Sequence, residues 1–323
     1  MKSSARRFRP MNVSQILDET VELYKSSFVL LVGIAAVMYV PYAVLTQFAL
    51  ARMFDISALA RANSAEMYLT IGLVVVGYLY LILSAIFVTG AMTYAISEEY
   101  LGRKVTIIES FRRVFRGSVI GPLLGAILVK AMAVLGALLI IVPVIVLAVV
   151  QNQRLWLAAA PILICISVFF ACYIMLRLAL TESIVVLEMK GIRRSLSRTW
   201  KLMPGSMMKY LSLIIIAYLV MGIVSSIVSG PVQVLMSMNL DKGASPSMVL
   251  VVLNTLINAV VGTILAPVAS IVTILLYYDI RIRKEGFDLE MLAQELNSGD
   301  VTYGYSAPNL PQEQTQYEAG PDQ

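Results

Sequence analysis

The chain has no histidine, only two cysteines and few charged residues. Because histidine is missing from all 323 residues, the sequence excludes Ser-His and Cys-His nucleophile pairs, imidazole metal sites and histidine proton relays. The two cysteines, Cys165 and Cys172, would lie about 10 Å apart along one helix. That separation is too long for a disulfide bond, and two thiols alone make a poor metal site. We therefore expect two free thiols, no metal and no other cofactor.

Charged side chains make up only 14% of the chain, whereas apolar residues make up 59% and the mean hydropathy is +0.82. Soluble domains are nearer one-half apolar. The composition therefore predicts an integral membrane protein. The sequence contains neither a G-x-x-x-x-G-K-[ST] loop nor a G-x-G-x-x-G fingerprint, so no nucleotide-binding motif points to an enzyme.

Long apolar runs are the main feature of the sequence. A helix of about 20 apolar residues crosses a bilayer, and six segments meet this requirement. The sequence thus predicts an all-α integral membrane protein with a six-span domain at 28–284. The predicted transmembrane helices are approximately 28–50, 68–96, 119–150, 155–176, 210–235 and 248–278.

The basic residues gather on one side of these spans. Nineteen of the 25 Lys and Arg residues fall in the N-terminal arm and in the loops on the same side of the spans, whereas four fall in the opposite loops. Cytoplasmic loops carry an excess of Lys and Arg. We therefore expect a multi-pass protein of the bacterial cytoplasmic (inner) membrane with both termini in the cytoplasm.

A short amphipathic segment precedes each pair of spans. Its apolar residues recur at i, i+4, i+7 and i+8, which is one face of an α-helix, and it ends in an aromatic residue and a cation. This pattern is typical of a helix that lies in the membrane interface with its stripe facing lipid. The stripes are Ile16, Thr20, Leu23, Tyr24; Ile107, Phe111, Val114, Phe115; and Ile192, Leu196, Thr199, Trp200.

The recurrence favours three parallel repeats, each an interfacial amphipathic helix followed by a transmembrane hairpin. The units would cover about 12–97, 104–187 and 191–284 and be related by an axis along the membrane normal. The alternative is that any basic loop before a hydrophobic span produces such a pattern.

The two ends of the chain differ from the membrane domain in composition. Residues 1–27 are expected to form a cytoplasmic arm and the first interfacial helix, and 285–296 a short cytoplasmic helix. Residues 297–323 are rich in Gly, Pro, Gln and acids with little aliphatic content. Such a segment buries too little apolar surface to fold, and we expect a disordered tail.

Three charged residues at or near the spans form the candidate intramembrane polar site: Lys130, Arg177 and Glu182. An unpaired charge at mid-bilayer costs about 2.5–3.5 kcal/mol on insertion scales. Lys130 either binds an anion inside the bundle or extends to the interface. Arg177 and Glu182 would lie about 140° apart on one helix, so each should contact another helix. They act either as an interface clamp or as a phosphate or substrate contact.

Small residues recur every fourth position in two spans, at Gly222, Ser226 and Gly230 and at Gly121 and Gly125. This spacing lets helix backbones approach closely. We expect it to serve packing within the bundle, with a homodimer face as the alternative.

The aromatic and basic residues beside the spans are candidate contacts to lipid headgroups. Anionic phospholipid is the expected partner, alongside partner membrane proteins or further copies of the chain, and no nucleic acid is expected. The candidate contacts are Tyr24, Lys25, Arg112, Arg113, Phe115, Arg116, Arg193, Arg194, Arg198, Trp200, Lys201, Arg281 and Arg283.

Several segments resemble a bacterial family named for the membrane domain of glycerophosphoryl diester phosphodiesterase. The resemblance covers about residues 10–293, and its C-terminal run is the most specific part. The segments are Met11-Asn-Val-Ser-Gln-Ile-Leu-Asp-Glu19 with Leu23-Tyr24, Arg177-Leu-Ala-Leu-Thr181 with Val185-Val-Leu-Glu188, Ser195-Leu-Ser-Arg-Thr-Trp200-Lys-Leu202, and Tyr277-Tyr-Asp-Ile-Arg-Ile-Arg-Lys-Glu-Gly-Phe-Asp-Leu-Glu290.

The resemblance implies a multi-span membrane domain that is sometimes joined to a soluble phosphodiesterase. The catalytic domain of that enzyme would use histidine and acidic metal ligands. This chain has no histidine and no room for a barrel of about 250 residues. We therefore expect the membrane part only, without the activity in the family's name, and carry over no catalytic residue.

Three hypotheses about function follow. The first is a non-enzymatic inner-membrane protein whose interfacial helices bind lipid headgroups, acting as a membrane scaffold or lipid-handling component. The second is a transporter or channel for a small or lipid-like substrate, with Lys130, Arg177 and Glu182 in a polar pathway. The third is a lipid enzyme that works with the carboxylates of Glu182 and Glu188 alone, and it ranks last because neither has an evident partner acid.

Overall fold

The computed structural model describes residues 10–53, 64–115, 119–139, 153–241 and 248–286, and every regular element in these ranges is an α-helix. The all-α class predicted from the sequence is therefore confirmed. The long helices are α2 (Phe28–Met53), α4 (Ser64–Tyr100), α6 (Ile120–Leu139), α8 (Gln153–Arg177), α11 (Met207–Asp241) and α12 (Met248–Glu285). The short helices are α1 (Val13–Ser26), α5 (Ile107–Phe115), α9 (Thr181–Glu188) and α10 (Ile192–Leu202).

Several of these helices are long and apolar enough to cross a membrane. Within the described residues, three qualify: Ile164–Glu188, Met207–Met238 and Val249–Glu285. Two bent pairs, α1 with the start of α2 and α5 with α6, raise the number to five if each pair is one span. Parts of the predicted spans 119–150 and 155–176 lie in or beside the undescribed residues 140–152. The chain is thus a multi-pass helical protein, and the number six stays a prediction.

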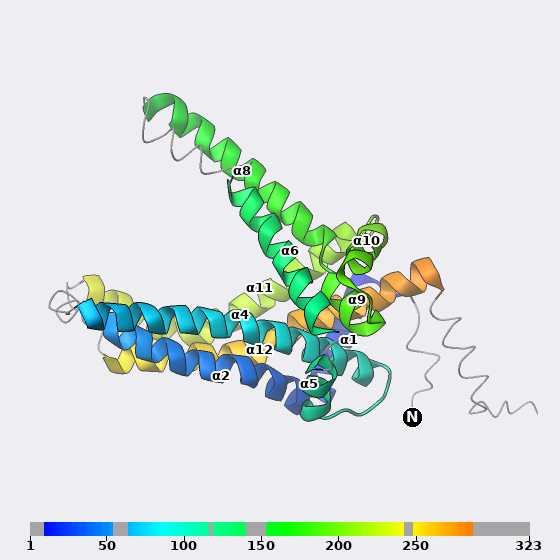
Figure 1. Ribbon diagram of the computed structural model, residues 1–323, viewed down its shortest axis with the longest axis horizontal. Helices are drawn as coiled ribbons and strands as arrows, with labels where there is room; N and C mark the ends of the chain where they lie inside the picture. The colour runs from blue at the N-terminus through cyan, green and yellow to red at the C-terminus, as the bar shows by residue number, and fades with distance from the viewer. Residues whose placement is uncertain (1–9, 54–63, 116–118, 140–152, 242–247, 287–323) are drawn as a thin grey trace, which may run out of the picture.

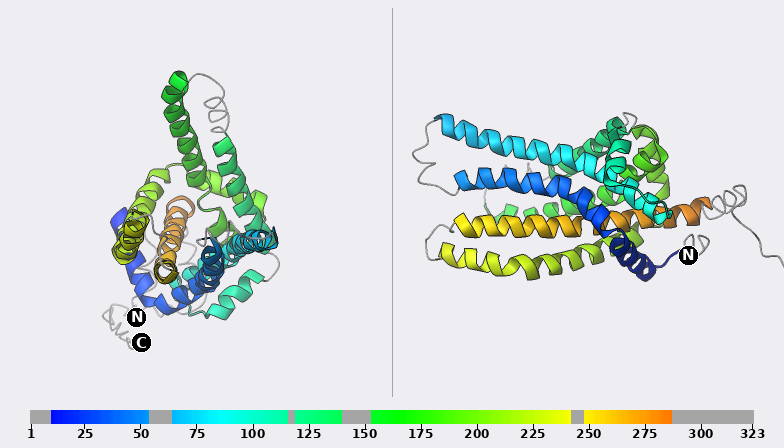
Figure 2. Two further views of the ribbon diagram at one scale, coloured as in Figure 1. Left: turned by 90° about the vertical axis from the view of Figure 1, so that its left-hand side faces the viewer. Right: turned by 90° about the horizontal axis from the view of Figure 1, so that it is seen from below.

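The long helices form a bundle and a separate hairpin (Figure 1). Helices α2, α4, α11 and α12 run side by side in both views, whereas α6 and α8 leave the bundle together (Figure 2). Helix α12 is central, because 44% of its most apolar window is buried against 11% for α11. It contacts α1, α2, α4 and α11.

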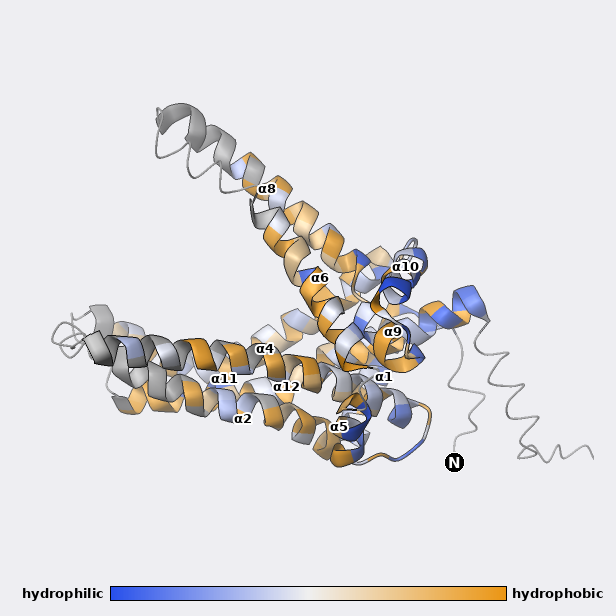
Figure 3. Ribbon diagram, viewed as in Figure 1, coloured by the Kyte–Doolittle hydropathy of each residue, from blue (hydrophilic) through white to orange (hydrophobic). Residues whose placement is uncertain are grey.

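The short helices gather at the end of the molecule where the hairpin meets the bundle (Figure 1). The chain bends by 81° between α1 and α2 and by 84° between α5 and α6. Hydrophilic residues concentrate on α5, α10 and the last turns of α12, while the long helices are mostly apolar (Figure 3). This end of the molecule is called the polar end below.

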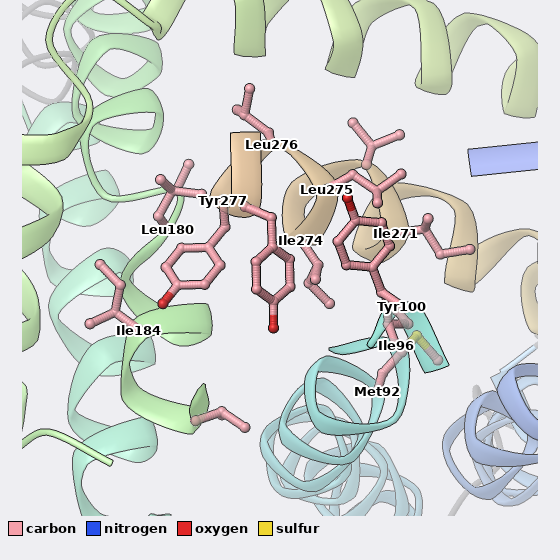
Figure 4. Packing of buried hydrophobic residues seen from close by; sticks show 14 of the residues in the cluster. Met92, Ile96, Tyr100, Leu180, Ile184, Ile271, Ile274, Leu275, Leu276 and Tyr277 are labelled. Atoms are coloured by element: carbon pink, nitrogen blue, oxygen red, sulfur yellow. The ribbon is translucent and has the colours of Figure 1, made fainter. Parts of the chain in front are cut away.

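The best-packed core also lies at the polar end, between α4, α9 and α12 (Figure 4). Tyr100 and Tyr277 are among the largest fully buried side chains. The rings of Tyr100 and Tyr278 lie 5.1 Å apart, and the hydroxyl groups of Ser97 and Tyr278 share a hydrogen bond of 2.6 Å. The buried tyrosine has therefore found the polar partner that its hydroxyl requires.

Three of the short helices make a repeating set of contacts. Helix α5 contacts α2 and α4, α10 contacts α6 and α9, and α1 contacts α11 and α12 as well as its neighbour α2. The contacts of α5 and of α10 each place an isoleucine against a glycine. A Cβ atom on Gly33 of α2 would lie 2.6 Å from Ile107 Cδ1, and one on Gly125 of α6 would lie 2.5 Å from Ile192 Cδ1. The first stripe residue of α5 and of α10 thus rests on a glycine of the preceding hairpin.

The small-residue stripe of α11 does not pack as predicted. A Cβ atom placed on Gly222 or Gly230 would have no neighbour within 4 Å among the described residues, and Ser226 is exposed. Gly121 is likewise open, whereas Gly125 packs against Ile192. The reason is that α11 is an outer helix of the bundle, so the stripe points away from it. The expected helix packing is therefore absent at the described positions of the α11 stripe, whereas Gly125 of α6 packs against α10.

Several predictions fall outside the described residues: the arm before Pro10, Arg116, most of the segment 285–296 and the tail 297–323. Helix α12 itself continues to Glu285, past the end predicted for the last span.

Candidate functional site

The three predicted intramembrane residues divide into two contacts. Lys130 Nζ of α6 lies 2.9 Å from Glu182 Oε1 of α9, with side chains only 16% and 23% exposed. Arg177 instead donates hydrogen bonds to the carbonyl of Trp200 (3.2 Å) and the hydroxyl of Tyr173 (3.0 Å). Its guanidinium lies 4.6 Å from the Trp200 ring centroid, a cation–π contact. Arg177 and Glu182 thus each contact another helix, as predicted, although they lie on separate helices, α8 and α9, and not on one helix.

The carboxylate of Glu188 joins α9, α10 and α12 at the polar end. It accepts hydrogen bonds from Lys190 Nζ (2.6 Å), Arg198 Nε (2.7 Å) and the Tyr277 hydroxyl (2.9 Å). Arg198 also pairs with Glu285 at 2.8 Å. The enzyme hypothesis from the sequence concerned only a partner acid for Glu188, whereas the partners of this carboxylate are cations of the following loop and the next helix and the hydroxyl of Tyr277.

Asp279 of α12 is a second, fully buried acid. It accepts the Met11 backbone N–H at 2.7 Å and pairs with Lys209 Nζ (2.5 Å) and Arg283 Nε (3.1 Å). Arg283 also donates to the Met11 carbonyl. Three donors therefore compensate one buried charge, which would otherwise be very costly. The contact fixes the chain just before α1 on α11 and α12.

The acid at the end of α4, Glu98, completes a recurring feature. Glu98 lies 3.4 Å from Arg103, Glu188 holds Lys190, and Asp279 holds the Met11 backbone. In each case a carboxylate near the end of a long helix or its extension binds the chain that leads into α5, α10 or α1. The sequence suggested that Asp279 offsets the basic residues after it, which the contact with Arg283 bears out, but it did not indicate that the three acids hold equivalent segments of the chain.

The amphipathic stripes face the protein and not lipid. Ile16, Thr20 and Leu23 of α1 are buried, as are Val114 of α5 and Thr199 of α10. The expectation of lipid-facing stripes is wrong for these positions, because the ends of the long helices offer a competing apolar surface. Only the terminal aromatics of α5 and α10 are exposed, Phe115 by 60% and Trp200 by 48%.

The candidate headgroup contacts fall into two sets. One set is exposed at the polar end: Lys25, Arg112, Phe115, Arg193, Arg194, Trp200 and Lys201. The other set has partners within the protein: Tyr24 with the Ile264 carbonyl, Arg113 with the Tyr94 ring, Arg198 with Glu188, Arg281 with Glu285, and Arg283 with Asp279. Within the described part of the chain, the cations of the first set form no ion pair with Glu188, Glu285 or Asp279 and suit contact with an external anion, whereas Trp200 and Phe115 also pack against Arg177 and Phe87.

An apolar pocket of about 650 Å³ lies between α2, α4 and α5. Helix α5 begins with a capping box, in which the Thr106 N–H and hydroxyl donate to Glu109 and the Glu109 N–H donates to the Thr106 hydroxyl. The two hydrogen bonds from Thr106 hold the pKa of the Glu109 carboxyl below its usual range. The rings of Phe87 and Phe115 stack at 4.7 Å beside the pocket. Arg112 is the charged residue in its lining.

No metal site is apparent in the part of the chain that the structure describes, where no group of three Cys, Asp or Glu side chains could hold an ion. The fold and its polar end define a multi-pass helical membrane protein. No protein-family model, curated protein or solved structure matches the chain. The resemblance described from the sequence therefore stays a prediction.

Proposed function

We propose that the chain is a non-enzymatic six-span protein of the bacterial inner membrane, acting as a membrane scaffold or lipid-handling component that binds anionic phospholipid at its polar end. The observation that carries this proposal is the pair of bends, 81° and 84°, between the short helices and the long ones. If the long helices cross the bilayer, α1 and α5 lie close to its plane. Exposed cations of these helices, Lys25 and Arg112, would then lie at headgroup depth, on the cytoplasmic side. Arg193 and Lys201 are exposed on α10 at the same end of the molecule.

The same proposal includes three parallel repeats. Two observations support it. Each of α5, α10 and α1 packs on a long helix of another unit: α5 on α2 and α4, α10 on α6, and α1 on α11 and α12. One acid binds the chain before each of these short helices. The contacts form a closed ring, as expected if equivalent units are related by an axis along the membrane normal.

The assignment as a non-enzyme is supported by the partners of the two acids that the enzyme hypothesis needs. Glu182 pairs with Lys130, and Glu188 binds Arg198, Lys190 and Tyr277. Both carboxylates are thus committed to contacts between helices.

Spin-label depth measurements test the proposal. Labels would be placed at exposed positions 108 of α5 and 193 of α10 in bilayers, with position 168 of α8 as the reference for lipid exposure. We expect the first two labels at headgroup depth and the third in the hydrocarbon. Full water exposure of both short helices would reject the lipid contact.

A transporter or channel is the second candidate, favoured by the partly buried Lys130–Glu182 pair between α6 and α9. Cysteine labelling along α6 and α8 with a water-soluble reagent distinguishes the two functions. A labelled stripe with helical period supports a water-lined pathway, and uniform protection rejects it.

A further inference from the structure

The pocket between α2, α4 and α5 combines an apolar wall with a cationic rim. Its wall is almost wholly apolar and includes Val37 of α2, Leu83 of α4 and Phe111 of α5. Val37 is 45% exposed and Leu83 is 55% exposed, so apolar side chains border open space. A space of this kind in a bilayer excludes water and takes up hydrocarbon.

The rim is formed by the outer face of α5. Ile108, Arg112 and Phe115 follow the spacing i, i+4, i+7 on one helix face. Ile108 is 70% exposed and Phe115 60% exposed, and both line the pocket with Arg112. A ligand that satisfies this arrangement has an apolar chain and an anionic group at one end of it.

We propose that this pocket is a binding site for one acyl chain of an anionic glycerophospholipid, whose phosphate contacts Arg112. The occupant is a bilayer lipid because α5 turns by 84° from α6, which places the cation at headgroup depth and the pocket below it. Arg112 supplies the charge complementarity, and guanidinium binds phosphate with two parallel hydrogen bonds. The inference rests on the proposed function and adds a specific site to it.

The site is particular to α5. The positions of α10 that correspond to Ile108, Arg112 and Phe115 are Arg193, Ser197 and Trp200, and those of α1 are Leu17, Val21 and Tyr24. Neither helix repeats the order apolar, arginine, aromatic. Arg193, an exposed cation of α10, therefore provides a matched control for Arg112.

Photo-crosslinking with lipid tests the site in the full chain reconstituted in nanodiscs. The probes are phosphatidylglycerol and phosphatidylcholine with the same diazirine-bearing acyl chain, and labelled peptides are mapped by mass spectrometry. We expect phosphatidylglycerol to label residues 80–88 of α4 above the level on exposed α8. Leu83→Trp should lower this labelling, because the indole is larger than the leucine side chain and narrows the pocket.

The charge at the rim is tested by Arg112→Gln. This variant should lower the preference for phosphatidylglycerol over phosphatidylcholine by about fivefold, the factor that corresponds to about 1 kcal/mol per cation near an anionic surface. Arg193→Gln should leave labelling at 80–88 unchanged. Both side chains are exposed, so neither change threatens folding.

The proposal is overturned if labelling of 80–88 equals that of α8, or if neither Leu83→Trp nor Arg112→Gln changes it. The spin-label depth of α5 is an independent result. Headgroup depth without pocket labelling rejects this site and leaves the proposed function standing, whereas full water exposure of both α5 and α10 rejects the proposed function itself.

Discussion

The α11–α12 hairpin packs along the α2–α4 hairpin, whereas the α6–α8 hairpin diverges from both (Figure 2). In the first region, a Cβ atom on Gly262 of α12 would lie 2.7 Å from the Tyr39 ring of α2, so a ring fills the space over a glycine. In the second, large side chains such as Ile162 and Phe169 of α8 are 62% and 74% exposed. A small residue opposite a large ring therefore allows α2 and α12 to approach closely.

What the two regions share is their attachment at the polar end. The bundle is tied there by Asp279, with Lys209, Arg283 and Met11 around it. The diverging hairpin is tied by the Lys130–Glu182 pair and by Ile192 on Gly125. The comparison predicts that substitutions at these contacts lower the free energy of unfolding by different amounts, with the largest loss at Asp279.

Asp279→Asn should have the largest effect. The substitution removes the buried negative charge that compensates Lys209 and Arg283. Removing one partner of a buried ion pair lowers the free energy of unfolding by about 3–5 kcal/mol. Equilibrium unfolding in mixed micelles measures the loss. Asp18→Asn, on the exposed face of α1, should change stability little, and equal stability of the two variants would contradict the role of Asp279.

Gly262→Leu should come next, with a loss of about 1–3 kcal/mol from overpacking against Tyr39. Gly222→Leu is the matched control, because Gly222 has no described neighbour within 4 Å of its Cβ position and the new side chain would point outward. The same unfolding assay compares them. If Gly222→Leu is the more damaging, the assignment of tight and open helix faces fails.

Lys130→Met should destabilise the diverging hairpin by about 1–2 kcal/mol, less than a fully buried pair because both side chains are partly exposed. Glu182→Gln should cost a similar amount. The double variant should lose less than the sum of the two, since the interaction can be removed only once. Strict additivity in this cycle would show that the pair contributes nothing.

Trp200→Leu should have the smallest effect, a loss of about 0.5–1 kcal/mol from the contact with Arg177 at a partly exposed site. Trp200→Phe should retain part of the cation–π contact and so lose less stability than Trp200→Leu. If Trp200→Leu is as stable as the wild type, the contact between Arg177 of α8 and Trp200 of α10 does not stabilise the protein.

Much of the fold could be predicted because apolar runs set the helices almost alone. The predicted span 155–176 corresponds to α8 at Gln153–Arg177, and 28–50 to α2 at Phe28–Met53. The short helix α9 was missed, since Thr181–Glu188 continues an apolar run and its break from α8 depends on tertiary packing.

The candidate site could be predicted only in part. The sequence singled out Lys130 and Glu182 as charges in apolar surroundings, but partners such as Lys209 for Asp279 lie 70 residues apart. Helix periodicity also says which residues share a face and not what covers that face. For this reason Leu23 and Val114 were assigned to lipid although they pack inside the protein.

The central claim is that α1, α5 and α10 lie on one face of the membrane. Labelling with a membrane-impermeant maleimide tests it most directly, in a background where the exposed Cys165 and Cys172 are replaced by serine. Single cysteines at exposed positions 18, 109 and 201 should all react from the cytoplasmic face, whereas cysteines at 154 and 242 should react from the opposite face. Reaction of any one of the first three from the opposite face would contradict the three like-oriented hairpins.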